Sequence, residues 1–86
     1  MITDVGVENL AAAIIENTLK DYEAAYSQQL YLEGQRGRRE ELENAREEVE
    51  RLEKWFHSSW YEMLTNLDPD YLIKGVRERV RRKRHI

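Results

Sequence analysis

The chain of 86 residues has no cysteine and only one proline. Without cysteine, disulfides and thiolate metal sites are excluded. A domain of this length buries only about 60% of the surface that its unfolded chain exposes, so small domains often rely on disulfides, metal or self-association. The two histidines, His57 and His85, match no spacing of zinc ligands. The composition therefore leaves self-association as the means of stabilising this domain.

Long apolar runs are also missing. The longest covers residues 10–15, whereas a membrane-spanning helix needs about 20 residues. Asp4 and Glu8 stand near the start, where a signal peptide would have a basic region followed by an apolar one. We therefore expect one domain over residues 1–86, located in the cytoplasm and without a membrane partner.

The net charge of -3 conceals an uneven distribution. Residues 69–86 hold seven lysines and arginines against two acidic residues, a local charge of +5. The other 7 basic and 15 acidic residues give residues 1–68 a charge of -8. An acidic body with a basic tail is typical of docking onto a second subunit or an acidic ligand. The same pattern is explained equally well by attraction between the body and its own tail.

Glycine and proline divide the chain into three helical segments. Gly34 and Gly37 mark the first break, and Asp68 followed by Pro69 marks the second, as N-cap and first helical residue. Apolar residues between the breaks recur at helical spacing, without strand-like alternation. The pattern predicts helices over about 5–33, 38–66 and 69–83. The fold class is therefore all-α, with a long antiparallel helical hairpin and a shorter C-terminal helix.

The apolar pattern also predicts which faces are covered. The first segment carries a wide apolar stripe that includes Leu10 and Ile14, so we expect it to contact more than one helix and the protein to form a homo-oligomer. Gly75 lies inside a helical pattern, which favours a close approach by another helix. The second segment carries a heptad seam typical of a coiled-coil pair, made of Leu42, Ala45, Val49, Leu52, Phe56, Ser59 and Met63.

Residue types that support catalysis are present but are not suitably arranged. Nucleophilic catalysis needs a nucleophile, a base and an orienting group within reach of each other. His57, Ser58 and Ser59 are sequence neighbours, so their side chains diverge around the predicted helix. Carboxylate metal sites in bundles use repeated Glu-x-x-His motifs, and Glu53 and His57 are spaced four apart without a second copy. We expect no enzyme activity, cofactor or metal.

Aromatic residues concentrate at Trp55, Phe56, Trp60 and Tyr61. Phe56 continues the seam, and Trp60 is expected to pack beneath the third helix. Four aromatic residues within two helical turns cannot all face the core, which leaves Trp55 and Tyr61 for an interface or a ligand. Tryptophan and tyrosine are common at binding hot spots. Core or oligomer packing and a binding surface both remain open interpretations of this cluster.

The basic tail over residues 77–86 supplies a second candidate surface. Its cations could neutralise phosphates, giving salt-dependent binding to nucleic acid without sequence preference. The acidic body opposes such binding, and no helix-turn-helix pattern with a basic second helix is present. A solvated helix end whose cations complement the helix dipole is the alternative. The candidate nucleic-acid contacts are Arg77, Arg79, Arg81, Arg82, Lys83 and Arg84.

Three parts of the chain form a recognisable set: residues 9–15 with 20–22, residues 56–61, and residues 64–65 with 67–73. Together they resemble small uncharacterised proteins encoded by phages and mobile elements of Firmicutes. The family pattern has Leu-Ala-x-Ala-Ile-Ile early, then Phe-Phe-Arg-Ser-x-Trp-Phe, then Leu-Thr-x-x-Asp-Gly-x-Tyr-Leu-Ile. His57 stands here in place of the arginine and Pro69 in place of the glycine, so any role of that arginine is not carried over.

The resemblance implies a biological context, and it gives no mechanism. It predicts a phage-type binding protein that inhibits or sequesters a host factor, such as a counter-defence protein acting in the host cytoplasm on a protein effector or a nucleotide signal. A nucleic-acid-associated regulator and a structural assembly subunit are the alternatives. Thr65 and Asp68 also have a plain interpretation as helix caps. The predicted binding residues are Trp55, His57, Trp60, Tyr61, Thr65 and Asp68.

Overall fold

The computed structural model describes the backbone of residues 4–84 and the side chains of residues 10–83. Four helices follow one another: α1 (Asp4–Glu33), α2 (Arg39–Phe56), α3 (Ser59–Leu64) and α4 (Pro69–Arg84). No strand occurs within residues 4–84, and the predicted all-α class is confirmed. None of the helices in this part of the chain is long and apolar enough to cross a membrane.

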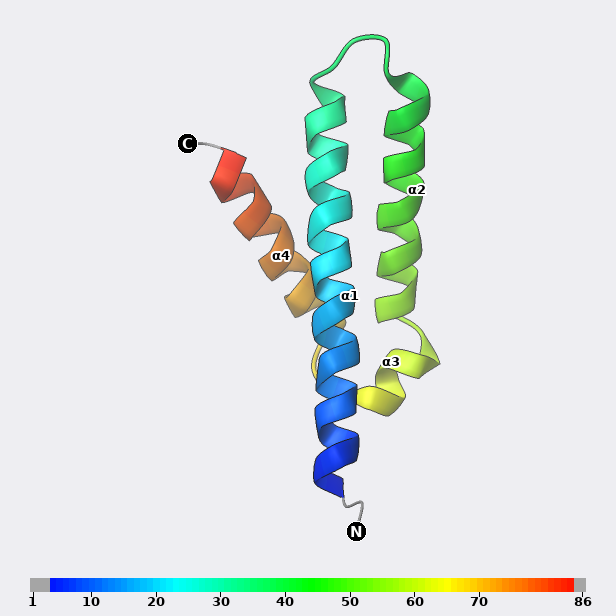
Figure 1. The fold of residues 1–86 in the computed structure, drawn as a ribbon, viewed down its shortest axis with the longest axis vertical. Coiled ribbons are helices and arrows are strands. Elements are labelled where there is room, and N and C mark those ends of the chain that lie inside the picture. Colours follow the sequence, from blue (N-terminus) through cyan, green and yellow to red (C-terminus); the bar gives the residue numbers. More distant parts are fainter. Residues whose placement is uncertain (1–3, 85–86) are drawn as a thin grey trace.

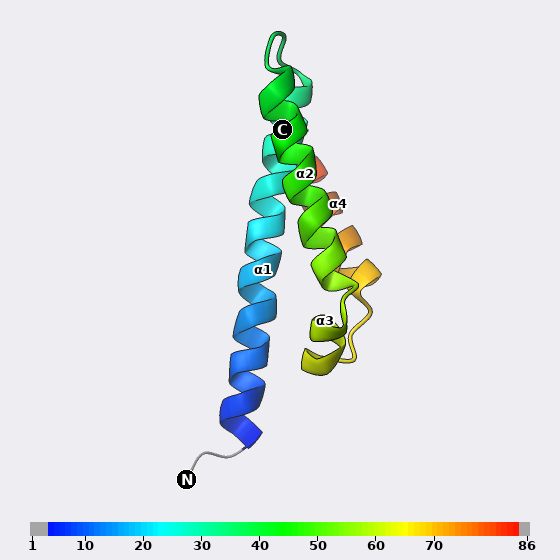
Figure 2. The ribbon, with the colours of Figure 1, turned by 90° about the vertical axis from the view of Figure 1, so that its right-hand side faces the viewer.

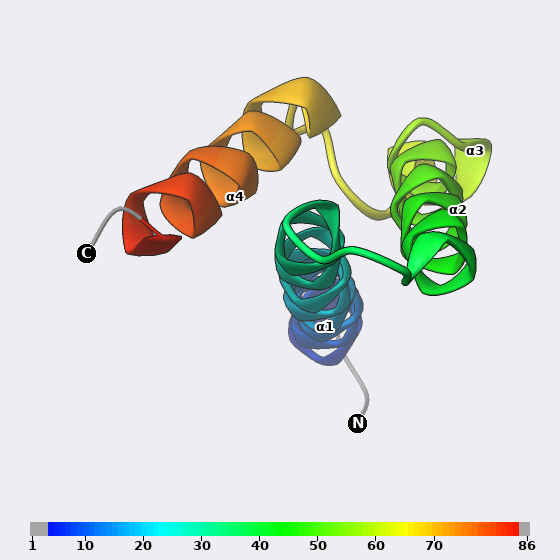
Figure 3. The same cartoon turned by 90° about the horizontal axis from the view of Figure 1, so that it is seen from above.

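The longest helix, α1, has the others packed against one side of it. In Figure 1, α1 and α2 lie side by side and run in opposite directions, joined by residues 34–38. Seen from above in Figure 3, α2 and α4 both lie on the same side of α1, and the opposite side has no helix against it. The molecule is elongated, with extents of 55 × 27 × 21 Å. Figure 2 shows the N-terminal end of α1 extending beyond α3.

The two expected breaks in the helices have the local chemistry that the sequence predicts. The first loop contains Gly37, whose φ of 76° lies in the left-handed region that glycine adopts without strain. Before α4, the Asp68 carboxylate accepts a hydrogen bond of 3.0 Å from the backbone N–H of Asp70, and Pro69 is the first helical residue. Both predicted breaks, near residues 34–37 and at Asp68–Pro69, are confirmed.

The prediction of one continuous helix over 38–66 is wrong. The helix α2 ends at Phe56, and α3 begins at Ser59 after a two-residue turn. Ser58 has an extended backbone, and its hydroxyl accepts from the backbone N–H of Tyr61 at 3.5 Å, so it is the N-cap of α3. This local bond competes with continuation of the helix. The predicted seam therefore ends at Phe56, and Ser59 and Met63 are exposed.

The core lies where α1, α2, α3 and α4 meet. Val76 and Val80, which are spaced four apart and so share one face of α4, are buried against it. Gly75, in contrast, has open space where a side chain would stand, so the expectation that it admits a close helix is wrong. The buried core residues are Ile15, Tyr22, Tyr26, Val49, Phe56, Tyr61, Ile73, Val76 and Val80.

Candidate functional site

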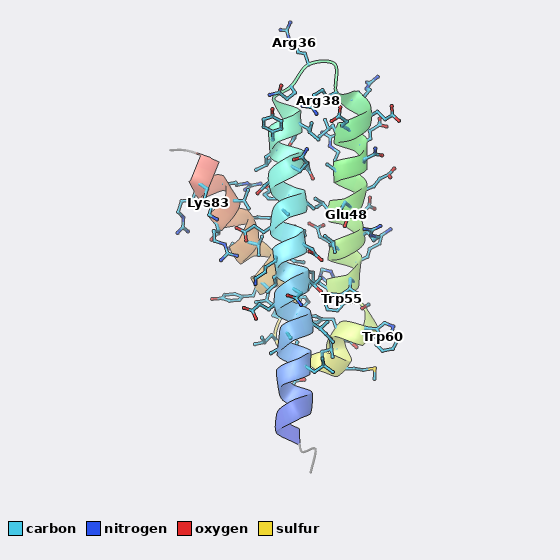
Figure 4. The ribbon with its side chains drawn as sticks, in the orientation of Figure 1. Arg36, Arg38, Glu48, Trp55, Trp60 and Lys83 are labelled. Carbon is cyan, nitrogen blue, oxygen red and sulfur yellow. The ribbon has the colours of Figure 1, made fainter. Side chains whose placement is uncertain are left out.

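The turn between α2 and α3 reverses the expected roles of two aromatic residues. Tyr61 is buried, with 1% of its surface exposed, although the sequence assigned it to an interface. Trp60 is 68% exposed, although the sequence placed it in the core, and Figure 4 shows it pointing outward from α3. Both corrections have one cause. When the helix restarts at Ser58, every later side chain is rotated relative to the seam of α2.

Tyr61 completes a packed group of aromatic rings. Its ring lies edge-on to Phe56 and Trp55, with centroid distances of 5.6 and 5.9 Å, and such edge contacts are favourable. The Tyr61 hydroxyl donates a hydrogen bond of 3.0 Å to the carbonyl oxygen of Leu67. Burial raises the pKa of this hydroxyl, so Tyr61 stays protonated. Tyr61 thus fixes the linker between α3 and α4, residues 65–68. Its own side chain is buried and is not available at the surface.

His57 connects the end of α2 with the start of α4. Its Nε2 lies 2.7 Å from a carboxylate oxygen of Asp70, and its Nδ1 lies 2.9 Å from the carbonyl oxygen of Glu53. The hydrogen bond to Glu53 and then the one to Asp70 raise the pKa of His57 above its usual 6.5. Because both ring nitrogens have partners, this predicted binding residue has an evident structural role.

Thr65 and Asp68 stabilise the linker between α3 and α4. The Thr65 hydroxyl accepts a hydrogen bond of 3.2 Å from the backbone N–H of Leu67. Asp68 accepts from the N–H of Asp70, as described above. The Asp68 contact is the capping role that the sequence allowed, whereas the Thr65 contact closes a turn between the two helices, because Leu67 belongs to neither of them. Both side chains still contact solvent: Asp68 is exposed and Thr65 is half-buried.

A polar cavity of about 440 Å³ brings four of the six predicted binding residues together. His57, Tyr61, Thr65 and Asp68 line it, whereas Trp55 and Trp60 do not. Its charged lining includes the carboxylates of Glu62 and Asp68. Carboxylates repel phosphate groups, so this cavity is poorly suited to a nucleotide.

An apolar groove of about 430 Å³ lies next to this cavity. One wall is the N-terminal half of α1, and the other is formed by α3, the linker and the start of α4. Glu16 is its one charged lining residue. The rim residue Leu67 is 59% exposed. The lining residues are Ala11, Ala12, Ile15, Glu16, Leu19, Leu64, Thr65, Leu67 and Leu72.

The sequence did not predict this groove, although one signal of it was available. The wide apolar stripe on the first segment indicated more apolar surface than two helices cover. The far wall could not be predicted, because it exists only after α3 turns away from the line of α2. Of the predicted site residues, Thr65 alone lines both the groove and the polar cavity.

The candidate nucleic-acid residues on α4 largely contact the protein's own body. Arg77 donates to the hydroxyl of Tyr22 at 2.7 Å and pairs with the carboxylate of Glu53. Its guanidinium also lies 5.2 Å from the ring centroid of Tyr26, a favourable cation–π distance. Tyr22 in turn donates to Glu53, and burial raises the pKa of Tyr22. This polar group ties α1, α2 and α4 together.

The next cations along α4 are paired with α1. Arg79 and Lys83 both reach Glu23, at 3.3 and 3.1 Å, and Arg81 donates to the hydroxyl of Tyr26 at 3.0 Å. Arg82 is exposed and takes part in none of the ion pairs among the described side chains. The side chain of Arg84, the sixth predicted contact, lies outside the described residues.

Comparison with protein-family models, curated proteins and solved structures gave no match. Among the described side chains, no group of three or more histidines and carboxylates is placed to hold a metal ion. The site is therefore defined by its geometry: an apolar groove, an adjoining acidic cavity, and the aromatic group that fixes the walls of both.

Proposed function

We propose that this protein is a non-catalytic binding protein that holds an amphipathic helix of a target protein in the groove between α1 and α3. The observation that supports this most is the groove itself, an open apolar surface of helical residues on a small, highly charged chain. Concave, mostly apolar surfaces of this volume are where proteins commonly bind their ligands. Grooves between helices commonly take the apolar face of a partner helix.

The charges around the groove specify the kind of helix. Glu16 lies in its wall, and Glu62 and Asp68 line the adjoining cavity. A partner helix with basic residues beside its apolar stripe would place its cations against these carboxylates. Complementary charges of this type mainly increase association rate and specificity, while the apolar contact supplies affinity. A nucleotide ligand is disfavoured by the same carboxylates.

The resemblance to phage proteins supplies the biological part of the proposal. By occupying a helix that a host protein needs for its own interactions, the protein would sequester or inhibit that host factor in the cytoplasm, as a counter-defence protein does. The engagement of both ring nitrogens of His57 supports a role without catalysis. The inward contacts of Arg77, Arg79 and Arg81 favour self-neutralisation over binding of nucleic acid.

The direct test uses a synthetic amphipathic peptide of leucine and lysine, titrated into ¹⁵N-labelled protein. We expect amide shifts on both walls of the groove, at Ala11, Ala12 and Leu64. Leu67→Asp should abolish the shifts, because it places a charge on the apolar rim. The matched control is Tyr71→Asp, an equally drastic change at a residue that is 77% exposed and outside the groove, and it should bind as the wild type does.

Two further peptides show whether the groove recognises the charge or the apolar stripe of the peptide. A peptide with glutamate in place of lysine should bind much more weakly, and a scrambled peptide without an apolar stripe should not bind. Shifts confined to α4, or full binding by the Leu67→Asp variant, would contradict the proposal. For the target itself, affinity capture from host lysate should retain a protein on the wild type and the Tyr71→Asp control that the Leu67→Asp variant loses.

A further inference from the structure

His57 lies between two oxygen atoms that accept hydrogen bonds and do not donate them. Its Nδ1 is 2.9 Å from the carbonyl oxygen of Glu53 on α2, and its Nε2 is 2.7 Å from a carboxylate oxygen of Asp70 on α4. Each ring nitrogen must therefore carry a proton to make its contact, and only the charged imidazolium carries both. We call these two contacts the His57 bridge. It is complete only when His57 is protonated.

The His57 bridge holds the beginning of α4, which forms part of the groove wall. Asp70 is the second residue of α4, and Leu72, two positions later, lines the groove. The linker before it is fixed separately, by the hydrogen bond from the Tyr61 hydroxyl to the carbonyl oxygen of Leu67. Among the described side chains, the next one of α4 to make a hydrogen bond or ion pair is Arg77, about two helical turns further on.

The charged groups around His57 favour its protonated form. Carboxylates approach it from α2, α3, the linker and α4, whereas α1 contributes no residue to the cavity that His57 lines. Lys54, one turn earlier on α2, is paired with Glu50, and the carboxylate of Glu53 is paired with Arg77. The hydrogen bonds to Glu53 and then Asp70 raise the pKa of His57. The carboxylates are those of Glu53, Glu62, Asp68 and Asp70.

We propose that the His57 bridge makes binding in the groove depend on pH, so that the groove holds an amphipathic helix more tightly when His57 is protonated. This inference rests on the proposed function of the groove and adds its regulation. When His57 loses a proton, one of the two contacts is lost, and the first turn of α4 is no longer tied to the end of α2. A ligand that needs Leu72 in place then binds only the fraction of molecules whose wall is correctly placed, which lowers its apparent affinity.

The direction and range of the effect follow from the chemistry of histidine. Histidine is the side chain whose charge changes around neutral pH, and this chain has only two histidines and no cysteine. Because the pKa of His57 is raised above 6.5 in the folded protein, the bridge is complete in mildly acidic solution. It is lost as the pH rises through that higher value. Affinity should therefore fall towards alkaline pH.

The first test measures binding of the leucine–lysine peptide by calorimetry at about pH 6 and about pH 8.5. The peptide's own lysines keep their charge over this range. We expect the dissociation constant of the wild type to be about threefold larger at the higher pH, a change of the size that one exposed ion pair can produce. His57→Gln and Asp70→Asn cannot form the charged bridge and should bind equally at both pH values. The matched control is His85→Gln, which removes the other histidine and should keep the pH dependence.

A permanently charged variant separates loss of the bridge from loss of folding. His57→Arg keeps a positive charge and several N–H donors at every pH used. It should bind the peptide at about pH 8.5 as tightly as the wild type does at about pH 6. A protein damaged by the substitution would bind more weakly at both.

The second test follows the bridge without a ligand. In ¹⁵N-labelled protein, the amides of Leu67 and Leu72 on the groove wall should shift with pH at the same midpoint as the ring protons of His57. These shifts should be absent from His57→Gln and present in His85→Gln.

Several results would overturn the proposal. The wild type could bind equally at both pH values, His57→Gln could retain the pH dependence, or the amides of the groove wall could fail to follow His57. A peptide that binds with the same affinity at both pH values would reject the regulation and leave the groove function standing. A peptide that does not bind at any pH would reject the groove function. The shifts in the free protein then decide whether His57 controls the wall.

Discussion

Individual side chains at the turn after α2 determine which aromatic residue faces solvent. The Ser58 hydroxyl accepts from the N–H of Tyr61 and donates to the carbonyl oxygen of Trp55 at 2.6 Å, so one serine ends one helix and starts the next. Tyr61 is consequently buried and Trp60 exposed. The sequence correctly indicated that four aromatic residues could not all be buried, but it assigned Trp55 and Tyr61 to the exposed side and Trp60 to the core.

Substitutions at these two neighbours should therefore have opposite consequences. Tyr61→Phe removes the hydrogen bond to the Leu67 carbonyl while keeping the ring, and should lower the free energy of unfolding by about 1 kcal/mol. Trp60→Ala removes a much larger side chain, yet should change it by less than about 0.5 kcal/mol because the ring lies in solvent. Urea unfolding measures both. A larger effect for Trp60→Ala would show that the tryptophan is in the core after all.

At the scale of elements, the residue that follows α2 is joined to the start of α4 by an ionisable contact between His57 and Asp70. Its contribution depends on pH. Because the pKa of His57 is raised in the folded protein, the stabilisation is fully present below the unfolded value near 6.5. It is lost as the pH rises through the higher folded value. The contact therefore stabilises the fold most in mildly acidic solution.

This pH dependence is measurable by comparing the wild type with His57→Gln. The difference between their urea midpoints should be largest in mildly acidic solution, below the ordinary pKa of histidine. It should shrink steadily above that. Asp70→Asn, which keeps the shape of its partner but removes the charge, should show the same trend. A difference that grows towards alkaline pH would contradict the proposed contact.

At the scale of the whole molecule, the uneven charge of the sequence brings α4 onto α1. The acidic body and the basic segment meet through Glu53 with Arg77 and through Glu23 with Arg79 and Lys83. Of the two explanations that the charge pattern allowed, the structure supports attraction within the chain. These partly exposed pairs are individually weak, but the group around Tyr22 is better shielded and joins three helices.

Arg77→Ala should accordingly destabilise the protein more than loss of any exposed cation. It removes the hydrogen bond to Tyr22, the pair with Glu53 and the contact with the Tyr26 ring. We expect a loss of about 1–2 kcal/mol in the free energy of unfolding. Hydrogen bonds to charged groups stabilise a fold more than hydrogen bonds between neutral groups do, but solvent partly screens this site.

The matched control for this prediction is Arg82→Ala. It removes the same side chain from an exposed position on the same helix, and its effect should stay within about 0.5 kcal/mol. Calorimetry or urea unfolding distinguishes the two variants. Equal effects would mean that helix propensity, and not the contact with Tyr22 and Glu53, determines the result.

The sequence by itself determined the helical class, the breaks at Gly37 and Asp68–Pro69, and the buried face of α4. Each follows from local chemistry: a left-handed glycine, a side-chain cap, or an apolar period of 3.6 residues. It did not determine the turn at Ser58, because serine is compatible with a helix and caps one only when the surrounding rings favour the turn. The groove and the pairing of Arg77 with Tyr22 and Glu53 were decided by tertiary structure alone. They join residues from segments that are distant in the chain, and periodicity describes only one segment at a time.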